Sequence, residues 1–345
     1  MCTIGKHGIW LLAIGCLLLA ACSSDSSTEP KSGGTLTVYP FAATYHDAAY
    51  ASRAISAGFN EFTPVHDLSL GLFIVPASGP VAGYDYTTVH PIHFSGEAWH
   101  SYTVVENNTD YLVFGYMPMQ NPISVTMNPV TGGYQMVFAN IDGAVTDDIS
   151  FVVGVKDMIG DLLQGSFQYT GQEGNNQVRL LMDHLFASVN FKFSLDAEYA
   201  NLRSIKLKSL TLKSTVQVVN AIVKLTPNIA DTDPVASVSF TKTDGESSTK
   251  FFENSTGEVL AANEITNFSC CFAPTAGNRL TLVSTYDVYD RHGNLIRENC
   301  TATNDLPVLN ETRGQRVTFN MKVIPTYLYM LSEPDLDNPT VRVDS

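Results

Sequence analysis

The residues that could bind a metal ion are few, and their spacing is poor for that purpose. The densest histidine group is the stretch "HPIH", which contains His90 and His93 and is followed by His100. Residues i and i+3 of an extended segment point to opposite faces, so two ligands at this spacing would need a turn between them. We therefore interpret these residues as loop histidines and expect neither a metal site nor a cofactor.

Carboxylates that could catalyse a reaction are also poorly placed. The stretch "SEPDLDNP" alternates Glu333, Asp335 and Asp337, but it lacks the central Gly and the closing Glu of an EF-hand, so a solvated linker is the better interpretation. Asp287 and Asp290 flank a tyrosine-rich strand, whereas a glycosidase needs two carboxylates roughly 5–10 Å apart across a cleft. The chain has no Gly-rich phosphate loop, nucleophile elbow, paired-His zinc motif or CxxC. We expect that it is not an enzyme, and keep a hydrolase only as a third hypothesis.

The spacing of the cysteines does not show whether they form a disulfide or remain free thiols. Of six in the chain, Cys270, Cys271 and Cys300 lie far from the N-terminus. In an exported protein one of the vicinal pair could form a disulfide with Cys300 across neighbouring strands, or all three could remain buried free thiols. For zinc the set is one ligand short of a closed site, with no histidine nearby.

The N-terminus predicts export. After Lys6, residues 9–21 form a thirteen-residue apolar run, which is shorter than the ~20 residues that span a bilayer as a helix. We interpret residues 1–21 as a signal peptide. The stretch "LAAC" resembles the lipobox of bacterial lipoproteins, and this resemblance implies that Cys22 is acylated with diacylglycerol and becomes the mature N-terminus. The alternative is an ordinary signal peptide with an incidental cysteine. Residues 22–34 are polar and predict a flexible tether.

The charge of the chain excludes several classes of partner. The net charge is −14, and removal of residues 1–21 takes away Lys6 and no acid, which makes it −15. Such a surface argues against nucleic acid, whose phosphates require Lys and Arg, and against electrostatic docking to anionic lipid. One basic residue stands out, because Arg53 is the only Lys or Arg between Lys31 and Lys156.

Alternation of apolar and polar residues predicts an all-β chain. The stretch "ASVNFKFSLD" places four apolar residues on one face, "RVTFNMKV" repeats the pattern, and "RLTLVSTYDVYDRHGNLIREN" predicts a hairpin. In "RSIKLKSLTLKS" the alternation slips by one residue, as a β-bulge would produce. Repeated short strands favour two β-sandwich domains, residues 35–172 and 173–324, with the boundary near "QYTGQEGNNQ".

The aromatic residues near Trp99 have two possible roles. They either line a sugar-binding face or form the core of a sandwich.

Five stretches in order resemble the fimbrillin family, the lipoprotein pilins of type V pili. The first, "GFNEFTPVHDLSLGLFIVP", follows Arg53 and Ala54 by a few residues, although His66 stands where relatives often have Gly. The others are "YLVFGYMP", "KDMIGDLLQG", "LLMDHLFASVNFKFSL", with a His two residues before a Phe-Ala step, and "GQRVTFNMKVIPTYLYMLSEPDLDN". The resemblance implies two transthyretin-like β-sandwiches in series without an active site.

The resemblance also implies a mechanism of assembly. In pilins of this family an arginine-specific protease removes an N-terminal strand, and the open groove accepts a C-terminal strand of the next subunit by β-strand addition. Here the cut would fall between Arg53 and Ala54, after a strand at residues 35–41. Residues 325–345 form a C-terminal extension whose candidate donor strand is Tyr327, Leu328, Tyr329, Met330 and Leu331. Alternatively, the extension folds back on its own domain and the strand at 35–41 is permanent.

We therefore expect a structural or adhesive subunit of a fimbria, located at the outer membrane or cell surface. Its partners would be other fimbrial subunits by strand exchange, the outer membrane through the N-terminal lipid before any cleavage, and a host or bacterial surface ligand, but not nucleic acid. The alternative is a permanently anchored lipoprotein that binds glycan or another ligand.

Overall fold

The computed structural model describes residues 33–43, 45–47, 59–61, 70–77, 90–95, 98–119, 123–127, 133–157, 167–225, 236–309 and 313–323. These residues are almost entirely β-strand and form three sheets, with one short helix, α1 (Ala197–Ala200). Asp196 caps α1 by accepting hydrogen bonds from the backbone N–H groups of Glu198 and Tyr199. Within these ranges no helix has the length and apolar character needed to cross a membrane.

The first sheet contains nine strands and closes partly on itself. Its order is β10 (Ser150–Asp157), β12 (Asn176–His184), β1 (Gly33–Ala43), β6 (Ala98–Glu106), β5 (His90–Ser95), β4 (Leu70–Pro76), β7 (Asp110–Met117) and β11 (Gln168–Thr170). β3 (Phe59–Glu61) pairs with β1, and β10 also pairs with β7, so the two ends of the sheet meet.

Two further sheets complete the fold. One has the order β16 (Thr266–Phe272), β13 (Ala187–Leu195), β19 (Gln315–Val323) and β2 (His46–Asp47). The other has the order β18 (Leu295–Asp305), β17 (Leu280–Asp290), β14 (Arg203–Leu225), β9 (Tyr134–Asp142) and β8 (Ile123–Met127), with β15 (Ala236–Leu260) paired to β14.

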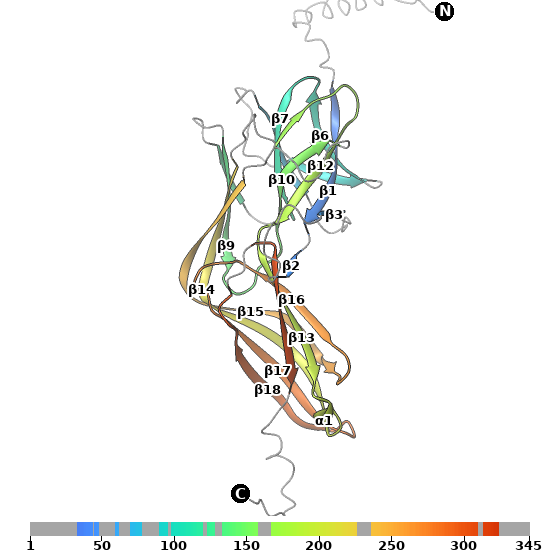
Figure 1. Cartoon of the computed structure of the whole chain (residues 1–345), viewed down its shortest axis with the longest axis vertical. Helices are drawn as coiled ribbons and strands as arrows, with labels where there is room; N and C mark the ends of the chain where they lie inside the picture. The colour runs from blue at the N-terminus through green and yellow to red at the C-terminus, as the bar shows by residue number, and fades with distance from the viewer. Residues whose placement is uncertain are drawn as a thin grey trace, which may run out of the picture.

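The sheets enclose two hydrophobic cores. The two sandwiches that contain them lie end to end along the molecule (Figure 1). In the first sandwich the nine-stranded sheet packs on β8, β9 and the second half of β14. In the second sandwich, β13, β16 and β19 pack on β17 and the first half of β14. The prediction of an all-β chain with two β-sandwiches is therefore confirmed.

The boundary between the sandwiches differs from the one expected at residues 172 and 173. β12 follows that point, yet it pairs with β1 and β10 in the first sheet. The change of core falls between Phe186 and Ala187, both of which are fully buried. The polar stretch "QYTGQEGNNQ" misled the prediction because it lies in and between two strands of one sheet, β11 and β12.

The sandwiches are also not simply arranged one after the other in sequence. The long strands β14 and β15 run through both of them (Figure 1). Residues 203–214 of β14 pair with β17 in the second sandwich, whereas residues 218–225 pair with β9 in the first. Part of the expected second domain, residues 173–324, therefore belongs to the first core.

Several predicted local features are confirmed. In β13, Val189, Phe191, Phe193 and Leu195 are buried and alternate with half-buried polar residues. β17 and β18 form the expected hairpin. The slip predicted in β14 is present as a shift of register between Leu207 and Ser209, against both neighbouring strands.

Candidate functional site

The N-terminal strand β1 occupies an interior position in the first sheet. It pairs in parallel with β12, from Leu36 opposite Asn176 to Ala42 opposite Met182, and antiparallel with β6 on its other edge. Leu36 and Val38 have no exposed surface. Burial of an aliphatic side chain of this size stabilises a fold by about 1.5–3 kcal/mol. The strand is therefore an integral part of the first core, although it lies near the start of the chain.

The beginning of β1 is held by a close backbone approach. A Cβ added to Gly34 would lie 1.5 Å from the carbonyl oxygen of Gly174, so only glycine fits there. Asn176, also fully buried, accepts hydrogen bonds from Tyr169 Oη at 2.8 Å and from the backbone N–H of Gln172 at 2.7 Å. These contacts fix the turn against which the first residues of β1 lie.

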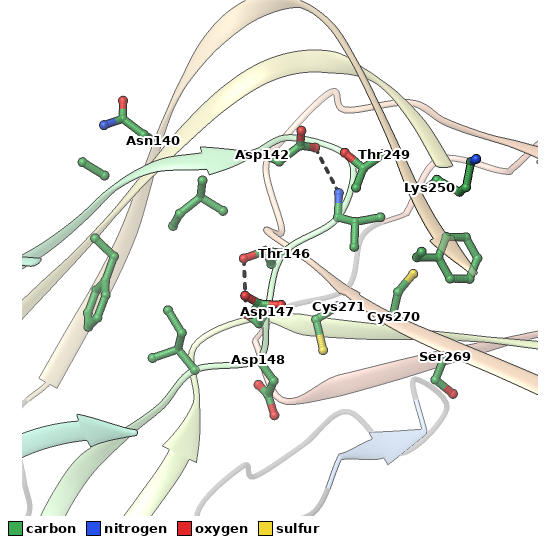
Figure 2. Close-up of a pocket in the computed structure, with 16 residues that line it drawn as sticks. Asn140, Asp142, Thr146, Asp147, Asp148, Thr249, Lys250, Ser269, Cys270 and Cys271 are labelled. Atoms are coloured by element: carbon green, nitrogen blue, oxygen red, sulfur yellow. Dashed lines mark hydrogen bonds between the residues drawn. The ribbon is translucent and has the colours of Figure 1, made fainter. Parts of the chain in front are cut away.

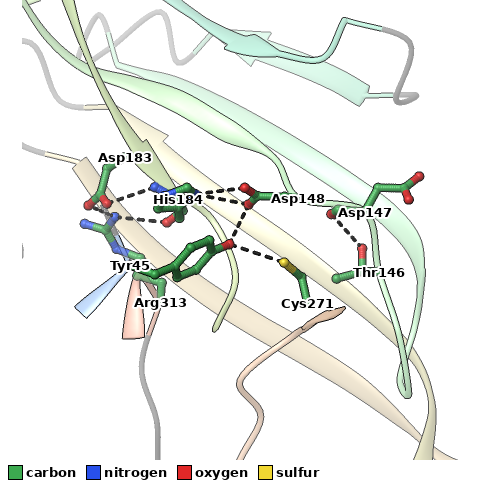
Figure 3. A network of polar contacts seen from close by, with 8 residues as sticks. All are labelled: Tyr45, Thr146, Asp147, Asp148, Asp183, His184, Cys271 and Arg313. Carbon is green, nitrogen blue, oxygen red and sulfur yellow. Dashed lines mark hydrogen bonds and ion pairs between the residues drawn. The ribbon is translucent and has the colours of Figure 1, made fainter. Parts of the chain in front are cut away.

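After β1 the chain passes from the first sandwich to the second, and Tyr45 lies at this junction (Figure 3). Its ring stacks on that of His184, with ring centroids 3.7 Å apart and an angle of 17° between the planes. Its hydroxyl donates to Asp148 Oδ1 at 2.7 Å and lies 3.4 Å from Cys271 Sγ. The guanidinium carbon of Arg316 lies 5.4 Å from the centroid of the Tyr45 ring.

Electrostatics keep this hydroxyl protonated. Burial raises the pKa of Tyr45 well above its usual range, and the Asp148 carboxylate raises it further. Asp148 is in turn 3.0 Å from His184 Nδ1. Since the phenol keeps its proton and the carboxylate can only accept, the Tyr45 hydroxyl serves as the donor.

A buried ion pair lies beside Tyr45 (Figure 3). Asp183, whose side chain is 1% exposed, pairs with the guanidinium of Arg313 and accepts from the backbone N–H of His184 at 2.8 Å. The Arg313 guanidinium also lies over the Phe151 ring, 5.3 Å from its centroid. This pair links the end of β12 in the first sandwich to the residues that precede β19 in the second.

Next to the junction is a cavity of about 650 Å³ (Figure 2). Its polar lining includes Asp147, Asp148, Lys250 and Ser269, together with Cys271. Burial, with a contribution from Asp148, raises the pKa of the Cys271 thiol to about 12. A thiol with so high a pKa is a poor nucleophile, because almost none of it is thiolate near neutral pH.

Many predicted site residues lie outside the part of the chain that the structure describes. These are the lipidation site, the cleavage site, the candidate donor strand and the acidic run of the C-terminal extension: Cys22, Arg53, Ala54, Tyr327, Leu328, Tyr329, Met330, Leu331, Glu333, Asp335 and Asp337. Those assignments stay predictions.

Of the two alternatives that the spacing left open for the cysteines, the structure has the second, because Cys270, Cys271 and Cys300 are free thiols. β16, which carries the vicinal pair, belongs to a different sheet from β18, which carries Cys300, so the two are not neighbouring strands. Cys271 instead meets Tyr45 at the junction.

Other predicted residues have structural roles. The histidines lie on strands and not in a loop, because His93 on β5 pairs with His100 on β6. Among the described residues no group of potential ligands could hold a metal ion. Trp99 is buried in the first core and is not part of an exposed sugar-binding face.

The two acids near the β17 hairpin do not form a catalytic pair. Asp287 is buried and lies 3.5 Å from Lys208 Nζ. Asp290 accepts from the backbone N–H groups of His292 and Asn294 at 2.8 Å each, and these bonds close the turn. Hydrogen bonds from Asn294 lower the pKa of Asp290. One acid therefore has an ionic partner and the other stabilises a turn.

Sequence reasoning missed Tyr45, Asp148 and Asp183, because the contacts of the junction join residues more than a hundred positions apart. One signal was available. His184 belongs to the stretch "LLMDHLFASVNFKFSL", which carried part of the family resemblance.

Comparison with known proteins gives structural neighbours only. Neither a family model nor a curated protein matches the chain. A candidate cell adhesion protein from Bacteroides ovatus is 16% identical, with a TM-score of 0.44 over 85% of this chain and 93% of that chain. A fimbrial protein from Bacteroides vulgatus is 12% identical, with a TM-score of 0.40 over 83% and 95%. The fimbrial anchor protein Mfa2 from Porphyromonas gingivalis is 12% identical, with a TM-score of 0.31 over 79% and 82%. With TM-scores below 0.5, these likenesses assign neither a family nor a function.

Proposed function

We propose that this protein is a fimbrillin-like structural or adhesive subunit of a cell-surface fimbria, without enzymatic activity. It would be exported as a lipoprotein acylated at Cys22 and assembled by strand insertion after cleavage between Arg53 and Ala54. One observation carries the proposal: β1 is an interior strand of the first sheet, and it precedes Arg53 in the chain. A single cut after Arg53 therefore separates the whole of β1 from the body of the protein.

Loss of β1 would create a site for another strand. The facing edges of β12 and β6 would lose their backbone partners, and the space filled by Leu36 and Val38 would open. Unpaired edges beside an apolar groove favour the addition of an extended peptide, with backbone hydrogen bonds for affinity and side-chain pockets for specificity. Residues 327–331 of a second copy would supply the short apolar strand that such a groove accepts.

The experiment that tests this function is the N-terminal mass of the protein taken from the outer surface of its own cells. We expect a chain that begins at Ala54. Arg53→Lys keeps the positive charge but removes the arginine, so it should block both this cleavage and polymer formation. Lys31→Ala is the matched control, because it alters the preceding basic residue and should leave both unchanged. A surface chain that still begins at acylated Cys22 would refute assembly by cleavage.

A permanently anchored binding lipoprotein is the second candidate, and the cavity beside the junction favours it. Its volume of about 650 Å³ lies within the range of about 300–1,000 Å³ that is usual for ligand pockets. Asp147 and Lys250 could bind the hydroxyl groups of a glycan. Saturable binding of an oligosaccharide to the uncut chain, weakened by Asp147→Ala but not by Asp244→Ala on the exposed surface, would support this candidate.

A further inference from the structure

The N-terminal segment, residues 33–47, is attached to both sandwiches. β1 lies within the first sheet, whereas β2 pairs in parallel with β19 of the second sandwich, with His46 opposite Gln315 and Asp47 opposite Arg316. Tyr45 immediately precedes β2. Release of the segment therefore requires more than the loss of β1 from its groove, because its junction contacts must also break.

Four side chains form a tyrosine socket around Tyr45: His184, Asp148, Cys271 and Arg316. They come from β12, the connection between β9 and β10, β16 and β19, so both sandwiches contribute. β12, β16 and β19 are held in their own sheets, and the connection that carries Asp148 is held by backbone hydrogen bonds of Thr146 to Cys271 at 2.9 Å and of Leu185 to Ile149 at 2.7 Å. The four residues of the socket therefore belong to the part of the protein that follows the N-terminal segment, and only Tyr45 belongs to the segment itself.

The socket is specific for a phenol. The His184 ring and the Arg316 guanidinium both interact with an aromatic face, which Phe would also provide. The hydroxyl is different, because its bond to the Asp148 carboxylate is short and charge-assisted. An aromatic side chain without the hydroxyl would lose this bond, whereas Asp148, whose side chain is 38% exposed, would keep His184 as a partner, so the preference for tyrosine is worth one hydrogen bond to a charged group.

We infer that the tyrosine socket is a latch that retains the N-terminal segment on the protein after the chain is cut on its C-terminal side. The use of this latch in the cell rests on the proposed cleavage at Arg53. It would make cleavage and strand release separate steps. An incoming donor strand would then have to displace a bound segment and would not meet an empty groove.

The latch can be tested on the purified protein whether or not cells cleave it. Trypsin can cut at Arg53 and at Lys31, the two basic residues between Cys22 and Lys156, and so leaves residues 32–53 as a separate peptide. Digestion is stopped when the mass shows only these cuts, and native mass spectrometry then follows the loss of the peptide with time. We expect the nicked wild-type protein to keep its peptide.

Two matched variants isolate the hydroxyl. Tyr45→Phe should release the peptide about ten- to a hundredfold faster, which is the effect of losing one hydrogen bond to a charged group. Tyr39→Phe removes a hydroxyl from a half-buried tyrosine of the same segment and should release it at the wild-type rate. Equal rates for the two variants, or immediate loss of the peptide from the wild-type protein, would overturn the inference.

If trypsin does not cut at Arg53, amide hydrogen exchange of the uncut chain tests the latch instead. Exchange at residues 45–47 should be about ten- to a hundredfold faster in Tyr45→Phe than in Tyr39→Phe, and equal exchange would overturn the latch. Different results would refute the proposed function and the latch. A surface chain that begins at Cys22 would remove the cleavage and leave the socket intact, whereas equal release rates would remove the latch and leave the cleavage intact.

Discussion

Phe186 and Ala187 are neighbours in the chain, yet their fully buried side chains belong to different hydrophobic cores. The chain passes there from β12 of the first sandwich to β13 of the second without a linker. β14 and β15 then return to the first sandwich and reinforce the connection. The two sandwiches therefore share continuous strands and are not independent units joined by a tether.

This sharing predicts coupled unfolding. Phe191 is fully buried in the second core, and its replacement by Ala should lower the free energy of unfolding by about 3–5 kcal/mol. Trp99, in the first core, is the one tryptophan of a chain that begins at Cys22, so its fluorescence reports the first sandwich. We expect Phe191→Ala to shift the denaturant midpoint of Trp99 fluorescence, whereas Lys192→Ala should not. If the midpoint measured by Trp99 fluorescence stays fixed while the midpoint measured by circular dichroism shifts, the sandwiches unfold separately.

The packing of β1 in the first core can be weakened by one substitution on its buried face. Leu36→Ala should cost about 2–5 kcal/mol, because the surrounding core cannot fully close the space left by the side chain. Thr35, the residue before Leu36, is exposed, so Thr35→Ala is a suitable control. Hydrogen exchange of the β12 amides that face β1 should be faster in Leu36→Ala alone. Equal exchange in both variants would mean that β1 is not held by its buried face.

The ion pair at the junction should contribute more than one on the surface. Arg313→Met leaves the Asp183 carboxylate buried without a cation, which we expect to cost about 3–5 kcal/mol. Lys242→Met disrupts a pair with Asp244, whose side chain is 86% exposed, and should cost less than about 1 kcal/mol. Urea unfolding of both variants measures the difference. Similar losses would indicate that water reaches Asp183.

The thiol of Cys271 should be unreactive while the protein is folded. A pKa near 12 in place of 9.0 lowers the thiolate fraction at pH 8 about a thousandfold, and alkylation by iodoacetamide should slow accordingly. Mass spectrometry after timed alkylation measures this rate. Release of residues 32–53 removes Tyr45 from the thiol and should speed alkylation, which makes Cys271 a reporter of the latch. Rapid alkylation of the intact folded chain would contradict the expectation.

The raised pKa of Cys271 also predicts how the free energy of unfolding depends on pH. The folded protein favours the neutral Cys271 thiol, so the stabilising contribution is complete below pH 9, the ordinary value. It should decline as the pH rises from 9 towards about 12, because the unfolded chain loses the proton first. Cys271→Ala should flatten the fall of unfolding free energy with pH over that interval, and an unchanged slope would assign the fall to other groups.

Local patterns in the sequence determined the strands. In β13 the alternation of Phe191 and Phe193 with polar residues predicted a strand with one buried face. The phase slip in β14 and the hairpin of β17 and β18 were predictable for the same reason. Such features depend on residues two or a few positions apart, where the side-chain period of a strand is visible directly.

Only the tertiary structure decided where the cores divide and what meets at the junction. β12 alternates between buried and more exposed residues only up to Leu180, and the consecutive residues Leu180, Leu181 and Met182 are all buried, so its pattern does not identify its sheet. Tyr45 and Asp148 meet because β2 and β19 pair in parallel while β12 pairs with β1. Strand pairing between distant segments is set by the packing of the whole fold, and a single sequence carries no local record of it.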